Sequence, residues 1–199
     1  CTLEVPERAD GPRASPCLMM TLLLDLPLPD APTRRALPVL GDTLDRQKDI
    51  VYLDATPRSV LNAPASTGIG CRSVNPYVGC AFGCAYCYAR YAHRYTMERA
   101  GTPAGAPNDG ALPPWLAFER RVLVKQNAPA LVRQALGGGS ARYRALRSGE
   151  ESLLVGSATD PYQPAERRFR ITRGVLEALA EHPGLRVSLI TKSPLVTRD

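Results

Sequence analysis

The chain has 199 residues, of which 44% are hydrophobic and 22% charged, and this composition suits one globular domain with its own core. No run of about eighteen apolar residues occurs, so we expect no membrane-spanning helix and a cytoplasmic location. The net charge of +6 is uneven: residues 1–70 carry seven basic and nine acidic side chains, whereas residues 85–147 carry ten basic and three acidic ones. The basic stretch is either a solvated, arginine-rich face or a surface for nucleic acid or phosphate, and the sequence leaves both open.

The first part of the chain shows little regular pattern. Residues 1–45 are rich in Pro, Ala and Arg without a sustained helix or strand period, so we expect a loosely ordered N-terminal extension. The domain proper is expected to cover residues 46–199. It opens with a short strand at 50–53 and a loop at 63–68, and residues 74–78 then lead into a cysteine-rich loop.

Helix and strand patterns alternate after this loop. We expect a helix at 88–99 ending before Gly101, a loop at 102–114, a strand at 121–125, a helix from the capping residue Asn127 to Leu136, a strand at 152–157, a helix at 170–182 and a strand at 185–191. Glu166 is expected in the first turn of a helix, where its charge suits the helix dipole. The alternation favours the α/β class, with a parallel sheet and helical crossovers.

The most informative segment is the cysteine loop, residues 79–88, in which Cys80, Cys84 and Cys87 have the spacing C-x3-C-x2-C. Iron–sulfur clusters are held by cysteine thiolates, normally four for a 4Fe-4S cubane, so three ligands leave one iron with an open position. An open metal position binds substrate, by the logic that separates catalytic from structural metal sites. A glycine directly precedes each of the first two cysteines and would let the backbone wrap closely around a bulky cluster.

Other interpretations of these cysteines remain open. Cys80, Cys84 and Cys87 also have the spacing of one helix face, although the neighbouring glycines and proline disfavour a helix. Zinc is a further candidate with His93 as fourth ligand, but His93 falls within an expected helix, where a packing or surface role is more common. Six cysteines in a secreted protein would indicate disulfides, whereas clustered cysteines in a reducing compartment are more often metal ligands.

The pattern C-x3-C-x-Tyr-C resembles the signature of the radical SAM superfamily, in which an aromatic residue precedes the third cysteine. The resemblance implies that Cys80, Cys84 and Cys87 bind a 4Fe-4S cluster whose unique iron holds the amino and carboxylate groups of S-adenosyl-L-methionine (SAM). It implies reductive cleavage of SAM to a 5′-deoxyadenosyl radical, with the electron supplied by an external reductant of the flavodoxin or ferredoxin type. Tyr86 would then lie near the adenine.

Flanking motifs are similar to the spore photoproduct lyase-related group, also called DNA repair photolyase-like. They are NPY at 75–77, YAR at 88–90, VKQNA at 124–128, TDPYQP at 159–164 and TKS at 191–193. The similarity implies the N-terminal portion of a partial TIM-type (β/α) barrel. It also implies lyase-like or nucleic-acid-modifying chemistry on an unidentified substrate, with nucleic acid as a candidate partner.

Further cofactor-binding residues are expected in loops that follow strands, because such loops build the active sites of parallel α/β barrels. Lys192, with Ser193 beside it, follows the last expected strand and could pair with the carboxylate of SAM. Ser157 or Asp160, which follow the preceding strand, could bind its amino group or the ribose. The simpler interpretations are an exposed lysine at a strand end and an aspartate that forms a turn before a proline.

Two features limit what the similarity carries over. Spore photoproduct lyases use a further cysteine downstream of the cluster motif as a hydrogen-atom donor, and this chain has no cysteine after Cys87, so that repair reaction is not expected. The 112 residues from 88 to 199 are too few for six β/α units, and the chain opens on Cys1 rather than methionine, so we expect a truncated barrel. Rival hypotheses are an iron–sulfur electron carrier or redox sensor with Cys71 as fourth ligand, a structural zinc module, and a truncated inactive relative.

Overall fold

The structure is a computed structural model that describes residues 39–100 and 112–199. The expected N-terminal extension up to residue 38, with Cys1 and Cys17, lies outside the described residues, as does the expected loop at 102–111. The described residues fall within one compact unit, Leu37–Asp199. Among the described helices, none is both long and apolar enough to cross a membrane.

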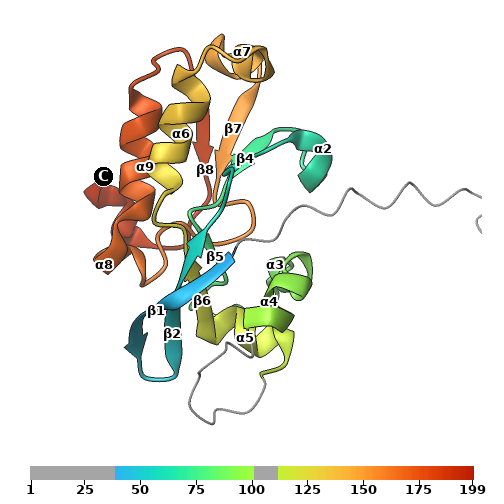
Figure 1. Cartoon of the computed structure of the whole chain (residues 1–199), viewed down its shortest axis with the longest axis vertical. Helices are drawn as coiled ribbons and strands as arrows, with labels where there is room; N and C mark the ends of the chain where they lie inside the picture. Colours follow the sequence, from blue (N-terminus) through green and yellow to red (C-terminus); the bar gives the residue numbers. More distant parts are fainter. Residues whose placement is uncertain (1–38, 101–111) are drawn as a thin grey trace, which may run out of the picture. The chain divides into compact units, whose positions relative to one another are not determined.

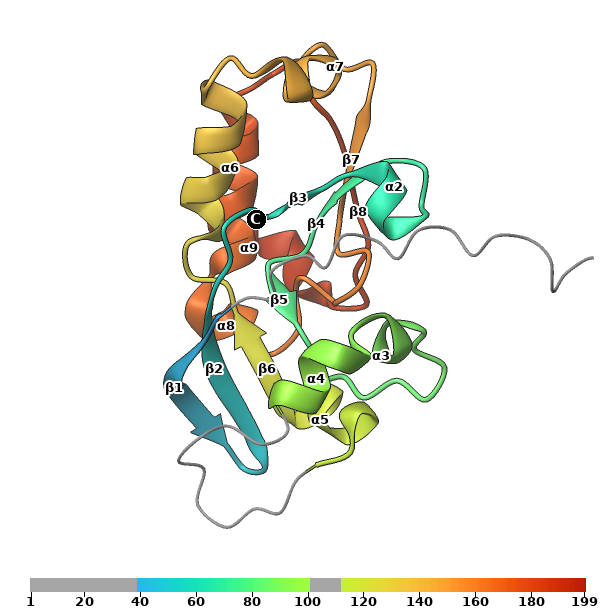
Figure 2. The same cartoon turned by 45° about the vertical axis from the view of Figure 1, so that its right-hand side comes forward.

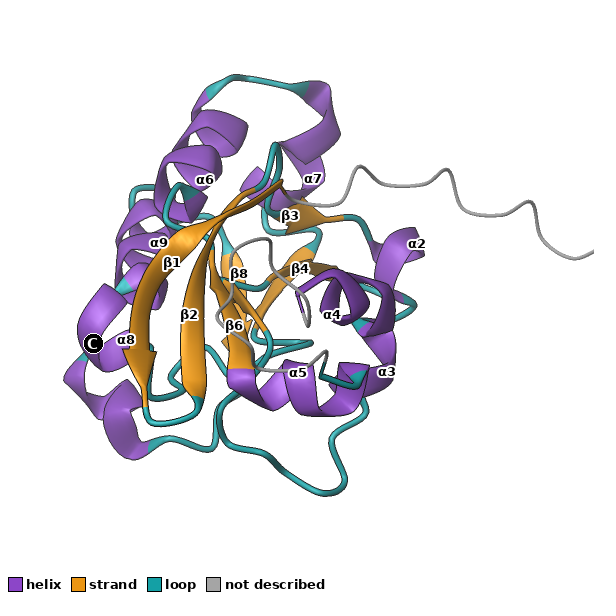
Figure 3. Cartoon of the chain, turned by 60° about the horizontal axis from the view of Figure 1, so that its bottom comes forward, coloured by secondary structure: helices purple, strands orange, loops and turns teal. Residues whose placement is uncertain are grey.

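One four-stranded sheet of the described chain has the strand order β1-β2-β6-β5. Its strands are β1 (Val39–Gln47), β2 (Ile50–Thr56), β6 (Arg121–Val124) and β5 (Tyr77–Val78). β2 pairs in parallel with β6, whereas β1 and β5 run antiparallel to their neighbours; β1, β2 and β6 lie side by side in Figure 3. The strands expected at 50–53 and 121–125 are therefore confirmed.

β1 corrects the expected boundary of the N-terminal extension. The sequence predicts residues 39–45 to belong to that loosely ordered extension, but they form a hairpin with β2 that turns at Lys48, whose φ is 54°. β1 is an edge strand, and its residues from 41 onward are exposed or half-buried. Such a strand lacks the alternation of apolar and polar residues by which a half-buried strand is detected in a sequence.

The second four-stranded sheet of the described chain has the order β3-β4-β7-β8. Its strands are β3 (Leu61–Asn62), β4 (Arg72–Val74), β7 (Ser152–Val155) and β8 (Arg186–Leu189). β4, β7 and β8 are parallel, and β3 runs antiparallel to β4. The strands expected at 152–157 and 185–191 are confirmed, and helices connect them as the α/β class requires.

β4 and β5 are consecutive strands that belong to different sheets. Asn75 and Pro76 separate them, and proline lacks the N–H that would continue a ladder. The carbonyl of Pro76 is instead paired with the backbone N–H of Lys125, which follows β6, at 3.2 Å. The described residues form two mixed sheets and no closed barrel, so the partial TIM-type barrel stays a prediction.

Helices α6 (Ala128–Gly137) and α9 (Ile171–Ala180) lie side by side in both Figure 1 and Figure 2. Leu136 of α6 and Val175 of α9 are buried in the same core as residues from both sheets. Burial of one such aliphatic side chain contributes about 1.5–3 kcal/mol to folding. The helices expected at 127–136 and 170–182 are thus confirmed.

The remaining helices are short. They are α2 (Pro64–Thr67), α3 (Ala89–Ala92), α4 (Arg94–Ala100), α5 (Pro114–Arg120), η1 (Ala141–Tyr143), α7 (Arg144–Arg147), α8 (Glu166–Phe169) and η2 (Pro194–Arg198). The single helix expected at 88–99 is interrupted at His93. α5 was not expected, because its prolines resemble those of a loop, although proline is tolerated in the first turn of a helix. Asn127 precedes α6 as expected, but its side chain donates to the carbonyl of Pro57 at 3.1 Å and does not cap the helix.

Candidate functional site

Three loops come together at the carboxyl ends of β5, β7 and β8. They are the cysteine loop 79–88 after β5, residues 156–165 after β7, and residues 190–193 after β8. Because β4, β7 and β8 are parallel, the segments that follow their carboxyl ends share one edge. Thr159 Oγ1 donates to the carbonyl of Gly79 at 2.7 Å, and Lys192 Nζ lies 3.2 Å from Cys84 Sγ. The structure therefore brings together segments that are far apart in the sequence.

Cys80 is the buried cysteine of the loop, with 7% of its surface exposed. Its backbone N–H donates to the carbonyl of Phe118 at 2.8 Å, which ties the loop to α5. Gly79 has a φ of 85°, and a Cβ there would lie 2.8 Å from the same carbonyl oxygen, so the backbone admits only glycine. Burial raises the pKa of the Cys80 thiol to about 11, although hydrogen bonds from the backbone of Phe82 and Asp160 lower it.

Cys84 and Cys87 occupy the more exposed side of the loop, and both are partly accessible. Gly83, with a φ of 60°, turns the chain just before Cys84. Arg90 donates from Nη2 to the carbonyl of Cys84 at 2.8 Å and forms an ion pair with Glu119 of α5. The backbone N–H of Cys87 also donates to the Cys84 carbonyl, at 3.1 Å. The backbone of the loop is therefore held at several points, while Cys84 and Cys87 are partly accessible and Cys87 packs against the core that contains Cys80.

The chemistry of these donors fits an iron–sulfur cluster, because three thiols lie within one short loop. Cys80 and Cys84 are close enough to interact electrostatically. Among the described residues, no three His, Cys, Asp or Glu side chains already converge into a metal-binding group.

His93 and Cys71, the candidate fourth ligands, do not lie with the three thiols of the cysteine loop as their fourth partner in the described structure. The His93 ring stacks on Phe118 with 6.1 Å between the ring centroids, which is a packing role. β4 and β5 follow one another along residues 72–78. Cys71 directly precedes this segment, whereas the cysteine loop directly follows it. Its neighbour Arg72 binds Glu151 at 2.6 Å, just before the start of β7. Cys71 thus lies at the end of β4 opposite to the cysteine loop.

Lys192 reaches the cysteine loop from the segment after β8. Its Nζ contacts Cys84 Sγ and the Tyr86 hydroxyl, and it lies 4.3 Å from the centroid of the Tyr86 ring. This is the geometry of a cation–π interaction. The Tyr86 side chain is otherwise open to solvent, with 77% exposure. The structure therefore places Lys192 and Tyr86, both expected near SAM, beside one of the three expected iron ligands.

The Asp160 carboxylate is engaged by the protein itself. One oxygen accepts from the backbone N–H of Tyr162 at 2.9 Å and from Thr191 Oγ1 at 2.7 Å. The other accepts from the backbone N–H of Lys192 at 2.7 Å. Asp160 therefore forms the turn that the simpler interpretation describes, and it also positions the backbone of Lys192.

The two serines expected to bind cofactor also hold the loops in place. Ser157 is buried, and its hydroxyl accepts from Asn75 Nδ2 at 3.0 Å. Asn75 Oδ1 accepts in turn from the backbone N–H of Ala158 at 2.9 Å. The Ser193 hydroxyl accepts from the backbone N–H of Leu195 at 3.3 Å, at the start of η2. Ser193 thus caps a 3₁₀ turn next to Lys192.

The sequence predicted no role for three polar residues that are buried at this edge. They are Asn75, Thr159 and Gln163. Each connects the segment before or within the cysteine loop to the loop after β7. The available signal was their place in the NPY and TDPYQP motifs, because polar side chains in a buried loop must find hydrogen-bond partners.

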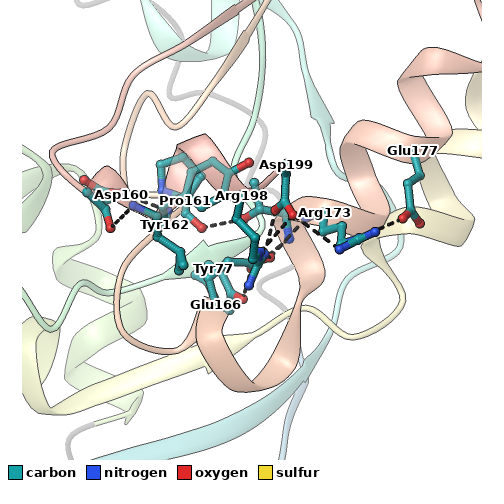
Figure 4. A network of polar contacts seen from close by, with 12 residues as sticks. Tyr77, Asp160, Pro161, Tyr162, Glu166, Arg173, Glu177, Arg198 and Asp199 are labelled. Atoms are coloured by element: carbon teal, nitrogen blue, oxygen red, sulfur yellow. Dashed lines mark hydrogen bonds and ion pairs between the residues drawn. The ribbon is translucent and has the colours of Figure 1, made fainter.

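Glu166 is fully buried and holds β5 against α9, as Figure 4 shows. Its carboxylate accepts from the hydroxyl of Tyr77 and from the backbone N–H groups of Thr172 and Arg173 at 2.9 and 3.0 Å. Arg198 lies 3.6 Å from it. Glu166 begins α8 as expected, but the helix start that it complements is that of α9. Glu166 therefore links β5, the strand that leads into the cysteine loop, to the N-terminus of α9.

The comparisons with known proteins give relatives without an assigned function. No family model and no solved structure matches the chain. The chain is 34% identical over 152 residues to the uncharacterized protein Rv2578c of Mycobacterium tuberculosis, covering 75% of this chain and 38% of that protein. The uncharacterized protein MJ0683 of Methanocaldococcus jannaschii is 30% identical over 126 residues, covering 63% of this chain and 37% of that protein. The chain thus spans less than two fifths of the length of these curated relatives.

Proposed function

We propose that the chain is part of a radical SAM enzyme that binds a 4Fe-4S cluster through Cys80, Cys84 and Cys87. The observation that supports this most is the contact of Lys192 with Cys84 and Tyr86. It joins the cysteine loop to the loop after β8, at the edge where parallel α/β proteins bind ligands. Because this chemistry depends on a reducing environment, we expect the protein to act in the cytoplasm.

Each residue of this edge has a role in the proposal. When bound, the cluster supplies one electron to SAM, so that the C5′–S bond breaks and methionine and a 5′-deoxyadenosyl radical are released. The electron comes from an external reductant of the flavodoxin or ferredoxin type. Lys192 binds the SAM carboxylate as a point charge, and Asp160 sets its position. Tyr86 packs near the adenine, and Ser157 and Ser193 keep the two supporting loops in place.

The test is anaerobic reconstitution with iron and sulfide, followed by dithionite and SAM and quantification of 5′-deoxyadenosine. Product that depends on Cys84 and disappears in the Cys84→Ala variant is the expected result. A reconstituted protein that never forms 5′-deoxyadenosine contradicts the proposal for this chain.

The electron-carrier hypothesis is tested with Cys71. A carrier needs a fourth protein ligand, whereas the proposed enzyme leaves one iron open for SAM. Because Cys71 lies at the opposite end of β4, we expect Cys71→Ala to retain the full amount of iron and sulfide. Loss of the cluster in Cys71→Ala, with no loss of fold by circular dichroism, would favour the carrier.

We also propose that the substrate is a nucleic acid. A surface of exposed aromatic side chains beside the cysteine loop supports this proposal. Tyr91, Tyr95 and Trp115 are 84%, 75% and 60% exposed, and they lie on α3, α4 and α5, which are neighbours in Figure 2. Exposed aromatic rings among arginines are typical of surfaces on which bases stack. The same stretch carries the basic charge noted in the sequence.

The nucleic-acid proposal predicts salt-dependent binding of a fluorescent single-stranded oligonucleotide of mixed sequence. Because base stacking on an aromatic side chain contributes about 1–3 kcal/mol, we expect Tyr91→Ser to weaken binding about tenfold. Ile69→Ser is the control, since Ile69 is also exposed, at 37%, but lies before β4, at the end opposite to the cysteine loop. Absence of binding at low salt would remove nucleic acid as a partner.

A further inference from the structure

The side chain of Gln163 brackets Cys80 on both sides. Its Oε1 accepts from the backbone N–H of Ala81 at 3.0 Å, and its Nε2 donates to the carbonyl of Gly79 at 3.1 Å. One side-chain amide thus pairs with the peptide groups immediately before and after Cys80, in the way that a neighbouring strand would. Gln163 itself is fully buried, with 0% of its surface exposed.

The orientation of this amide is determined by its partners. A backbone N–H can only donate and a carbonyl can only accept, so the Gln163 oxygen must face Ala81 and its nitrogen must face Gly79. The nitrogen also donates to Thr159 Oγ1 at 3.2 Å, and that hydroxyl donates to the Gly79 carbonyl at 2.7 Å. The three groups form a closed ring of hydrogen bonds.

The backbone of Gln163 is held as firmly as its side chain. Its N–H donates to the carbonyl of Asp160 at 3.3 Å, and its carbonyl accepts from the N–H of Glu166 at 2.9 Å. The amide therefore projects from a fixed turn after β7. Because the Cys80 N–H also donates to the carbonyl of Phe118 at 2.8 Å, the backbone around Cys80 is tied both to α5 and to the loop after β7.

We propose that Gln163 is a positioning residue for the buried cluster ligand Cys80, with Thr159 as its partner. Hydrogen-bond partners of metal ligands orient them and tune the bound metal. Gln163 does this through the peptide groups on both sides of the ligand, which holds the backbone of Cys80 in place. The part of this inference that concerns the cluster rests on the proposed function. The part that concerns the position of Cys80 can be tested in the metal-free chain.

The first experiment compares Gln163→Leu with Gln126→Leu after anaerobic reconstitution. Gln126 is a matched control, because its side chain also makes a hydrogen bond, to Asp54 at 3.0 Å, but on the exposed surface. Loss of hydrogen-bond partners of metal ligands typically costs 10- to 100-fold in affinity, so we expect Gln163→Leu to release iron to a chelator about tenfold faster. The electron paramagnetic resonance spectrum of its reduced cluster should also change, a signature that lower fold stability alone does not move.

A second pair covers the case in which Gln163→Leu does not fold. Thr159→Ser retains the hydroxyl that donates to Gly79, whereas Thr159→Val removes it at almost the same volume. We expect wild-type iron release and spectrum for Thr159→Ser and faster release with an altered spectrum for Thr159→Val. Wild-type release rates and spectra in folded Gln163→Leu would overturn the inference, and where that variant does not fold, wild-type values in Thr159→Val would do so.

The second readout needs no cluster and separates the two proposals. In the metal-free protein, we expect an alkylating reagent to modify Cys80 faster in Gln163→Leu than in wild type, relative to Cys71 in the same molecule. If the wild-type chain takes up no cluster, the proposed function fails, and this ratio still tests whether Gln163 holds Cys80. An unchanged ratio in a variant with wild-type circular dichroism would show that it does not.

Discussion

Lys192 and Cys84 are 108 positions apart in the sequence, yet Lys192 Nζ lies 3.2 Å from Cys84 Sγ. The lysine arrives from the end of β8, and the cysteine from the loop after β5. Their contact links a cation to the cysteine loop at the place where the proposed function requires an anionic group of SAM to bind.

Removal of this cation should weaken SAM binding. Because a hydrogen bond to a charged group contributes about 1.5–3 kcal/mol, we expect Lys192→Ala to bind SAM about tenfold or more weakly in calorimetric titration of the reconstituted protein. Lys48→Ala is the control, since Lys48 lies in the β1–β2 turn. Equal SAM affinity in Lys192→Ala and Lys48→Ala would contradict the role given to Lys192.

The close approach at Gly79 should make this position intolerant of a side chain. In Gly79→Ala the new Cβ would lie 2.8 Å from the Phe118 carbonyl oxygen at a φ of 85°. The positive φ costs about 1–2 kcal/mol and the overlap about 1–3 kcal/mol more. Gly139→Ala has a similar φ of 64° with open space around the Cβ, so it should lose only about 1 kcal/mol. Urea unfolding followed by circular dichroism measures both, and equal losses would show that the contact is relieved by relaxation.

The Tyr77 hydroxyl should contribute to stability through the buried Glu166 carboxylate. Burial and the Glu166 charge raise the pKa of Tyr77, so the phenol remains a proton donor throughout the accessible pH range. Tyr77→Phe removes one donor from a buried carboxylate, which should lower the free energy of unfolding by about 1.5–3 kcal/mol. Tyr95→Phe is the matched control, because the Tyr95 side chain is exposed, and it should change the free energy little. A loss no larger in Tyr77→Phe than in Tyr95→Phe would be inconsistent with this interaction.

His93 should make the protein less stable in mild acid. Burial, with a smaller effect of Lys125, lowers the pKa of His93 to about 4, from 6.5 in the unfolded chain. As the pH falls below 6.5 the unfolded state gains a proton that the folded state does not, so stability is lost progressively down to about pH 4. Between pH 7 and pH 5 this group should reduce the free energy of unfolding by about 2 kcal/mol.

The His93→Phe variant isolates this effect, since a phenyl ring can also stack on Phe118. Its free energy of unfolding should change less between pH 7 and pH 5 than that of the wild type. A wild-type slope in His93→Phe would assign the acid sensitivity to other groups.

Much of the local structure could be predicted from the sequence. The apolar runs at 50–53 and 152–157 are strands, and the spacing of Val175 and Leu179 predicted α9, because buried faces impose their period on the chain. β1 and α5 were missed, since an exposed edge strand has no alternating pattern and the prolines of α5 resemble those of a loop.

The sequence by itself determined the cysteine loop. Its three thiols have C-x3-C-x2-C spacing, with a glycine before two of them, and lie close together because they are near neighbours along the chain. The tertiary structure alone decided what surrounds the loop. Gln163 reaches Cys80 and Lys192 reaches Cys84 only because β4, β7 and β8 pair in parallel, which delivers the segments after them to one edge. Which strand pairs with which depends on contacts between distant residues, and no local pattern of side chains carries that information.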